Sequence, residues 1–319
     1  MRVRFWGTRG SLPAALPGAE VEAKIASALV KASGQAFADA TEARAFLAGL
    51  PFAERAAYGG NTSCVQIESG APDGEYLLCD LGSGLRAFSQ SQIEAGHTTG
   101  QTYNFLVSHV HWDHIMGFPF FVPAFIPGNT VRIYGCHDVL EQAFRNQQAQ
   151  PSFPVPLSVM GAKIEFIVLE AGRNYDIAGC KVRASLQEHS GDSFGYRIER
   201  DGKSVIYSTD AEHKLESEAC IDRYVDFIGK ADLVIFDSMY SLADAISVKQ
   251  DWGHSSNIVG VDLCHRGNVR RYCMFHHEPI CSDADLDRVL AETLRYEQLM
   301  REGSPLEVLS SYDGMELEI

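Results

Sequence analysis

The chain has 319 residues, of which 45% are hydrophobic, and its 27 basic and 42 acidic side chains give a formal net charge of −15. The acidic balance argues against a broad basic surface for long nucleic acid, although it leaves room for a local basic pocket. Eight scattered cysteines without a CxxC pair indicate reduced thiols rather than a disulfide framework. Because no apolar run reaches the roughly 18 residues of a membrane span, we expect a soluble cytoplasmic protein with no membrane partner.

The N-terminal part of the chain predicts a strand followed by helices. The segment VRFWG reads as a short strand that ends at the glycine- and proline-containing GTRGSLP. Two helical patterns follow, at residues 19–30 and 39–50, and Asp39 has the character of a helix cap. Strand character resumes at YGGNTSCVQIES, so we interpret residues from about 15 to 56 as a helical insertion in a single domain spanning 1–319.

The remainder of the chain is rich in strands. EYLLCDLGSG, TYNFLVSHV and TVRIYG are apolar runs of strand length, and residues 163–213 contain several more strands separated by turns. Strands and helices then alternate, and the longest helical pattern covers residues 283–303. This order predicts an α+β fold in which helices cover two packed sheets, a four-layer αββα sandwich.

Four polar residues crowd together where the strand of TYNFLVSHV ends: His109, His111, Asp113 and His114. His109 and His111 are two positions apart, so on an extended segment their side chains point the same way and can contact one ion. Asp113 and His114 follow where the chain turns, and they can face a second point. Imidazole and carboxylate groups are preferred ligands of zinc, and this division favours two ions side by side.

A site with two metal ions needs further ligands, and these also follow apolar strands. His189 follows VRASLQE, Asp210 follows SVIYST, and the adjacent His276 and His277 follow RYCMF. A carboxylate at Asp210 is suited to bridging both ions. The sequence alone does not decide between His276 and His277.

These motifs resemble the metallo-β-lactamase fold superfamily. HVHWDH followed by a later His, Asp and His carries the resemblance, while FWGTRGSLP, DLGSG and WGHSSN resemble its phosphodiesterase branch, which includes ribonuclease Z and small cyclic-phosphodiester hydrolases. The resemblance implies two divalent metal ions, with zinc as the first choice and manganese or iron as alternatives. It assigns His109, His111 and His189 to the first ion, Asp113, His114 and His276 to the second, and Asp210 to the position between them, with His277 as the substitute for His276.

The same resemblance implies three supporting residues. Asp80 in DLGSG would orient a ligand histidine, and the alternative for it is a carboxylate that only caps a turn. His254 in WGHSSN would donate a proton to a leaving oxygen or steady charge on a phosphoryl oxygen, with helix capping as the alternative. Asp237 would orient His254. The residues expected to take part in the chemistry are therefore Asp113, Asp210 and His254.

Together, these expectations predict that the protein hydrolyses a small or cyclic phosphodiester, of the cyclic-nucleotide kind, with a metal-activated hydroxide that attacks phosphorus. Only a hairpin-length segment separates His189 from Asp210, which leaves no room there for the arm that ribonuclease Z uses to hold tRNA. The alternatives are tRNA 3′-processing, carboxyl-ester or lactone hydrolysis on the same fold, and a metal-binding signalling module without catalysis. The family resemblance also implies a homodimer.

Overall fold

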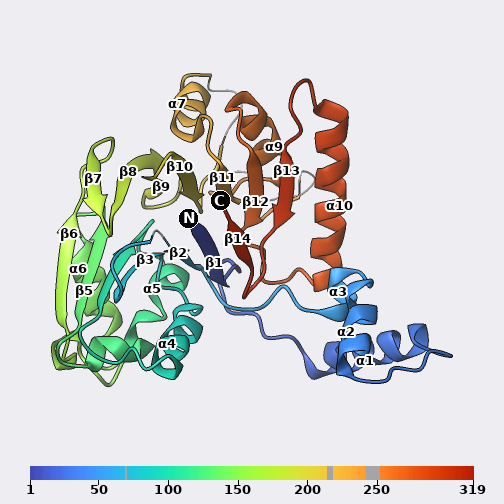
Figure 1. Ribbon diagram of the computed structural model, residues 1–319. Coiled ribbons are helices and arrows are strands. Elements are labelled where there is room, and N and C mark those ends of the chain that lie inside the picture. Colours follow the sequence, from blue (N-terminus) through green and yellow to red (C-terminus); the bar gives the residue numbers. More distant parts are fainter. Residues whose placement is uncertain (69, 214–217, 242–251) are drawn as a thin grey trace.

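The computed structural model describes residues 1–68, 70–213, 218–241 and 252–319. Two sheets, each of seven described strands, pack face to face, and helices cover their outer faces (Figure 1). This arrangement confirms the predicted α+β class and the four-layer αββα sandwich.

The first sheet has the strand order β14-β1-β2-β3-β4-β5-β6. Its strands are β1 (Arg2–Gly7), β2 (Cys64–Glu68), β3 (Glu75–Cys79), β4 (Thr102–Leu106), β5 (Thr130–Gly135), β6 (Lys163–Val168) and β14 (Glu316–Glu318). Strands β3 to β6 pair in parallel. Their carboxyl ends therefore lie along one edge of the sheet.

The second sheet has the order β13-β12-β11-β10-β9-β8-β7. Its strands are β7 (Asn174–Ile177), β8 (Cys180–Gln187), β9 (Ser193–Arg200), β10 (Lys203–Ser208), β11 (Leu233–Asp237), β12 (Arg271–Phe275) and β13 (Glu307–Ser310). Strands β10 to β13 are parallel, and β9 runs antiparallel to both β8 and β10. Strand β8 therefore ends at the same edge as β10, β11 and β12.

Alternating side chains build the core on both faces of each sheet. In β4, Leu106 faces the second sheet, whereas Phe105 packs under the helices of the first. In β12, Cys273 faces the first sheet and Met274 faces the helices of the second. This alternation follows from the two-residue repeat of a strand. Each fully buried side chain of the size of Phe105 contributes about 1.5–3 kcal/mol.

Helices from separate parts of the chain cover the two outer faces. The first sheet is covered by α4 (Leu85–Glu94), α5 (Trp112–Ile115) and α6 (Leu140–Gln147), with short 3₁₀ segments η1 (Phe118–Phe120), η2 (Val122–Phe125) and η3 (Leu157–Val159). The second is covered by α7 (Glu218–Ile228), α9 (Asn257–Arg266) and α10 (Asp283–Met300). The sequence patterns do not predict α4 and α7. Across the described part of the chain, no helix combines the length and the apolar character that crossing a membrane requires.

The predicted helical insertion lies between β1 and β2. It comprises α1 (Gly18–Lys31), α2 (Ala40–Ala48) and α3 (Phe52–Arg55), and it projects from the sandwich beside one end of α10 (Figure 1). The Asp39 carboxylate accepts hydrogen bonds from the first backbone N–H groups of α2, as its cap position predicts. The insertion is tied to α10 because Lys24 forms an ion pair with Asp283, and the backbone N–H of Ala53 donates to Asp287.

Candidate metal centre

The candidate site lies where strand ends from both sheets meet. The HVHWDH segment follows β4, His189 follows β8, Asp210 follows β10, and His276 follows β12. Asp210 and His276 have left-handed backbone conformations, with φ of 42° and 60°. Such a conformation is uncommon outside glycine and costs on the order of 1–3 kcal/mol, so the surrounding structure must hold it. Here it turns each side chain toward the shared site as the chain leaves its strand.

The first cluster consists of His109, His111, His189 and Asp210. Nε2 of His189 lies 3.2 Å from Nδ1 of His111. Asp210 Oδ2 lies 3.6 Å from His109 Nε2 and 3.7 Å from His189 Nε2. His109 and His111 therefore belong to one cluster, as their two-residue spacing predicts.

The second cluster consists of Asp113, His114, His276 and again Asp210. The other carboxylate oxygen of Asp210, Oδ1, lies 3.1 Å from Nε2 of both His114 and His276. Asp113 Oδ2 lies 3.1 Å from His114 Nε2 and accepts a 2.8 Å hydrogen bond from the backbone N–H of Ser11. Asp210 thus presents one oxygen to each cluster, which is the geometry of a bridging carboxylate.

The structure separates the two adjacent histidines that sequence analysis leaves open. His276 enters the second cluster, whereas His277 is buried and its Nε2–H donates to the carbonyl of Ser311 at 2.8 Å. Burial lowers the pKa of His277 to about 3, which keeps its ring neutral. The backbone of His277 pairs with the segment after β1, because its carbonyl accepts from the N–H of Gly10 and its N–H donates to the carbonyl of Thr8.

Asp80 holds one of the imidazoles in place. It is fully buried after β3, and its Oδ2 accepts from Nδ1 of His114 at 2.7 Å. Ser108 and the hydroxyl of Tyr207 also donate to this carboxylate. Because Nδ1 of His114 is engaged, its Nε2 points into the second cluster. Ser108 and Tyr207 are supporting residues that sequence analysis does not identify.

The WGHSSN turn contacts both clusters. The Nδ1–H of His189 donates to the carbonyl of Gly253 at 2.7 Å, and Nδ1–H of His254 donates to Asp237 at 2.8 Å. The ring of His254 stacks on that of His276 with centroids 5.1 Å apart. Burial opposes protonation of His254, but the charge of Asp237 and its hydrogen bond raise the pKa of His254 to about 9.

Ser256 caps the helix that follows this turn. Its side chain accepts from the backbone N–H of Val259 at the start of α9. His254 therefore does not cap this helix, which is the alternative role predicted for it from the sequence.

The charges of the two clusters suit cations. Burial acts against ionisation of Asp210, but His114, His276 and His109 hold its pKa well below the ordinary value. The pKa of Asp113 is lowered in the same way, against burial, by His114. Burial lowers the pKa of His109 well below its ordinary value. Burial opposes protonation of His114, but Asp210, Asp113 and Asp80 raise its pKa well above the ordinary value. Because ionised carboxylates and neutral imidazoles are the forms that bind metal ions, an ion in the second cluster would take the place of the proton on His114.

A buried imidazole nitrogen without a hydrogen-bond partner also indicates that the clusters can hold cations. Nε2 of His109 is buried without a hydrogen-bond partner, and it faces Asp210 at 3.6 Å. Leaving such an atom unsatisfied costs about 1–3 kcal/mol, and a cation between the two residues would remove that cost. In each cluster the four potential ligand atoms lie within 4.8 Å of one another, which leaves space for one ion per cluster.

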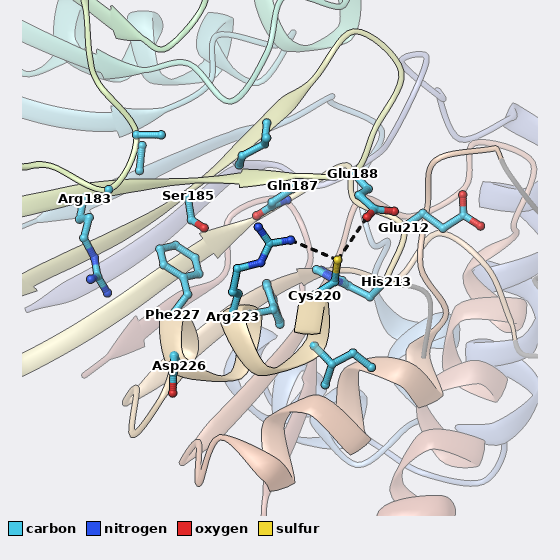
Figure 2. A pocket seen from close by; sticks show the side chains of 16 residues that line it. Arg183, Ser185, Gln187, Glu188, Glu212, His213, Cys220, Arg223, Asp226 and Phe227 are labelled. Carbon is cyan, nitrogen blue, oxygen red and sulfur yellow. Dashed lines mark hydrogen bonds between the residues drawn. The ribbon is translucent and has the colours of Figure 1, made fainter. Parts of the chain in front are cut away.

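A separate cavity of about 460 Å³ lies between β8 and α7 (Figure 2). Its described lining includes Glu188, which directly precedes His189, and Glu212, which lies two positions after Asp210. The Arg223 guanidinium lies 3.1 Å from the sulfur of Cys220 at its wall. The residues of the two metal clusters do not line this cavity, so it is distinct from the candidate centre.

Gly253 provides a test of how the first cluster is positioned. A Cβ added here would lie 2.5 Å from Nδ1 of His189, and φ is +82°. We therefore expect Gly253→Ala to displace His189 and lower metal affinity by about 10–100-fold, the range for loss of an orienting partner. Isothermal titration with Zn²⁺ measures this effect.

The matched control is Gly34→Ala, because Gly34 has the same φ of +82° but open space around its added Cβ. Both variants carry the backbone strain, and only Gly253→Ala disturbs His189. Equal zinc affinities in the two variants would contradict the positioning role of Gly253.

Comparison with known proteins supplies the family. A model of the Beta-lactamase superfamily domain matches residues 76–277. Ribonuclease Z from Oceanobacillus iheyensis is 22% identical over 295 residues, which cover 77% of this chain and 91% of that protein.

Two solved structures share the fold over nearly their whole lengths. Unliganded yeast PDE1 superposes with a TM-score of 0.66 at 14% identity, covering 100% of this chain and 99% of that one. The metallo-β-lactamase fold protein YhfI from Bacillus subtilis gives 0.64 at 16% identity, covering 99% and 98%. With the family model matching well over half of its residues, the chain belongs to the β-lactamase superfamily, and its fold is the metallo-β-lactamase fold.

Proposed function

We propose that this protein is a metal-dependent phosphodiesterase that hydrolyses a small or cyclic phosphodiester, of the cyclic-nucleotide kind. One observation carries the proposal: Asp210 presents Oδ2 to one imidazole cluster and Oδ1 to the other, which is the arrangement that a single centre of two ions would require. The similarity to ribonuclease Z and to yeast PDE1 supports phosphoester chemistry.

The ligands divide between two divalent ions. His109, His111 and His189 would hold the first, Asp113, His114 and His276 the second, and Asp210 would bridge them. Zinc suits this donor set, and manganese or iron would accept it. When bound, two such ions lower the pKa of a water molecule and neutralise charge on a phosphoryl oxygen.

The protein's own groups then complete the reaction. Asp210 and Asp113 fix the geometry of the centre and balance its positive charge. His254, with Nδ1 engaged by Asp237, has Nε2 as the nitrogen that can donate a proton to the leaving oxygen. Asp80 keeps His114 in its orientation through the Nδ1 hydrogen bond.

The structure between His189 and Asp210 supports a small substrate. All residues of this segment are described, and they form only the hairpin of β9 and β10. An arm for holding tRNA is therefore absent from this segment. The second candidate function is ribonuclease activity. It is favoured by the similarity to ribonuclease Z, which covers 91% of that protein.

A substrate comparison tests the proposal. We expect the zinc-loaded enzyme to hydrolyse bis(p-nitrophenyl) phosphate and at least one cyclic mono- or dinucleotide, and to act poorly on a lactone panel and on precursor tRNA. Preferential cleavage of precursor tRNA would favour the ribonuclease alternative. Preferential hydrolysis of lactones would replace phosphodiester chemistry with carboxyl-ester chemistry.

Metal removal gives a second expected result. Treatment with a chelator should abolish hydrolysis, and added Zn²⁺ or Mn²⁺ should restore it, because the two clusters supply ligands but no independent nucleophile. The proposal would be contradicted by a protein that metal analysis shows to be free of ions and that still keeps full activity.

A further inference from the structure

Two of the three tryptophans in the chain are strongly exposed. The side chain of Trp112 is 80% exposed and that of Trp252 is 63% exposed, whereas Trp6 is 7% exposed and packs in the core. Tryptophan is usually well buried, because its large apolar surface is costly to leave in water. Exposure of two indoles therefore calls for a specific explanation.

Both exposed tryptophans belong to segments that form the metal centre. Trp112 stands between His111 and Asp113, and its neighbours in α5 from Asp113 to Ile115 are buried. Trp252 precedes Gly253, whose carbonyl accepts from His189.

The two segments meet at the centre itself. Ring nitrogens of His111 and His189 lie 3.2 Å apart, so the segment of Trp112 contacts a histidine that the segment of Trp252 holds in place. Each exposed indole thus belongs to a residue directly beside one that contacts the first cluster, Trp112 beside His111 and Trp252 beside Gly253.

We propose that Trp112 and Trp252 bind a planar aromatic group of the substrate, a nucleobase, by stacking. This inference rests on the proposed phosphodiesterase function and assigns it a substrate class: nucleotides rather than alkyl phosphodiesters. Indole faces stack on any base and need no charge, which suits a chain with a net charge of −15.

Kinetics with a matched pair of substrates test the stacking. One substrate is adenosine 2′,3′-cyclic phosphate, and the other is methyl riboside 2′,3′-cyclic phosphate, which has the same reacting group without a base. Trp112→Ala and Trp252→Ala should each raise KM for the nucleotide about 10-fold and leave the base-free substrate unchanged. Trp112→Phe should retain most of the affinity, because it keeps an aromatic face.

The control variants separate stacking from general apolar contact. Ile280→Ala removes an 82% exposed aliphatic side chain that follows the His276 segment in the sequence, and Leu299→Ala removes a 65% exposed one on α10. Neither should alter the preference for the nucleotide. Equal losses on both substrates in the tryptophan variants, or an Ile280→Ala effect as large as theirs, would overturn the proposal in favour of an alkyl ligand.

Fluorescence gives a readout independent of turnover. Adenosine 5′-monophosphate added to the zinc-loaded protein should quench tryptophan emission, and ribose 5-phosphate should not. The double variant of Trp112 and Trp252, both changed to Ala, retains only the buried Trp6 and should lose the quenching. Unchanged quenching in this variant would overturn the stacking role. If the wild type hydrolyses no phosphodiester in the substrate comparison, the proposed reaction fails, while the titration still decides whether the tryptophans bind a base.

Discussion

Replacing Asp210 with alanine is expected to abolish phosphodiester hydrolysis and to prevent the protein from holding two metal ions. The carboxylate faces His109 and His189 through one oxygen and His114 and His276 through the other. Its removal leaves both clusters without their shared anion. The loss of metal affinity should exceed the roughly 10–100-fold that follows from removing an outer partner of a ligand. Metal analysis by mass spectrometry and the hydrolysis rate measure the two effects.

Asp210→Asn is the second variant to be tested at this position, because it keeps the volume of the side chain while removing its charge. Asp262→Asn serves as the control, since Asp262 lies on α9 and accepts a hydrogen bond from Tyr296 outside both clusters. Circular dichroism establishes that each variant is folded. A folded Asp210→Asn protein with two bound ions and wild-type activity would show that Asp210 is not the bridge.

Replacing His254 with alanine is expected to lower kcat for a cyclic nucleotide by about 100–1,000-fold, within the usual range for a general acid. The ribose oxygen is a poor leaving group that needs a proton as it departs. For bis(p-nitrophenyl) phosphate the loss should be much smaller, because nitrophenolate departs without protonation. The comparison of kcat for the two substrates is the measurement.

Asp237→Asn should reproduce part of the leaving-group-dependent loss, because Asp237 accepts from Nδ1 of His254 and positions its ring. The control is His265→Ala, a histidine at the end of α9 beside Glu297. Equal decreases on both substrates in His254→Ala would assign His254 a structural role and remove the proton donor from the proposed reaction.

The sequence predicts which side chains come together where one residue marks one strand end. HVHWDH, His189 and Asp210 each follow an apolar run, and parallel strands bring their carboxyl ends to a common edge. The layered fold is predictable for the same reason, since alternating apolar residues define both faces of each sheet. Helix α4 escapes prediction because its large buried apolar side chains are few, chiefly Leu85 and Phe88.

Other parts of the site depend on geometry that leaves little trace in the sequence. His276 and His277 are adjacent and chemically identical, and the left-handed backbone at His276 determines which one enters the cluster. The partner of His189 is a backbone carbonyl at Gly253, which any residue type would supply. Tyr207 reaches Asp80 from the opposite sheet, a contact between residues 127 positions apart.

The most direct test of the dinuclear centre is an anomalous diffraction map of zinc-soaked crystals, recorded at the zinc absorption edge. Two peaks are expected about 3.5–4 Å apart, the usual separation in two-metal hydrolytic sites, with the Asp210 carboxylate between them. The first should lie among His109, His111 and His189, and the second among Asp113, His114 and His276. A map with no peak at Asp210, or with zinc bound only elsewhere, would contradict the account.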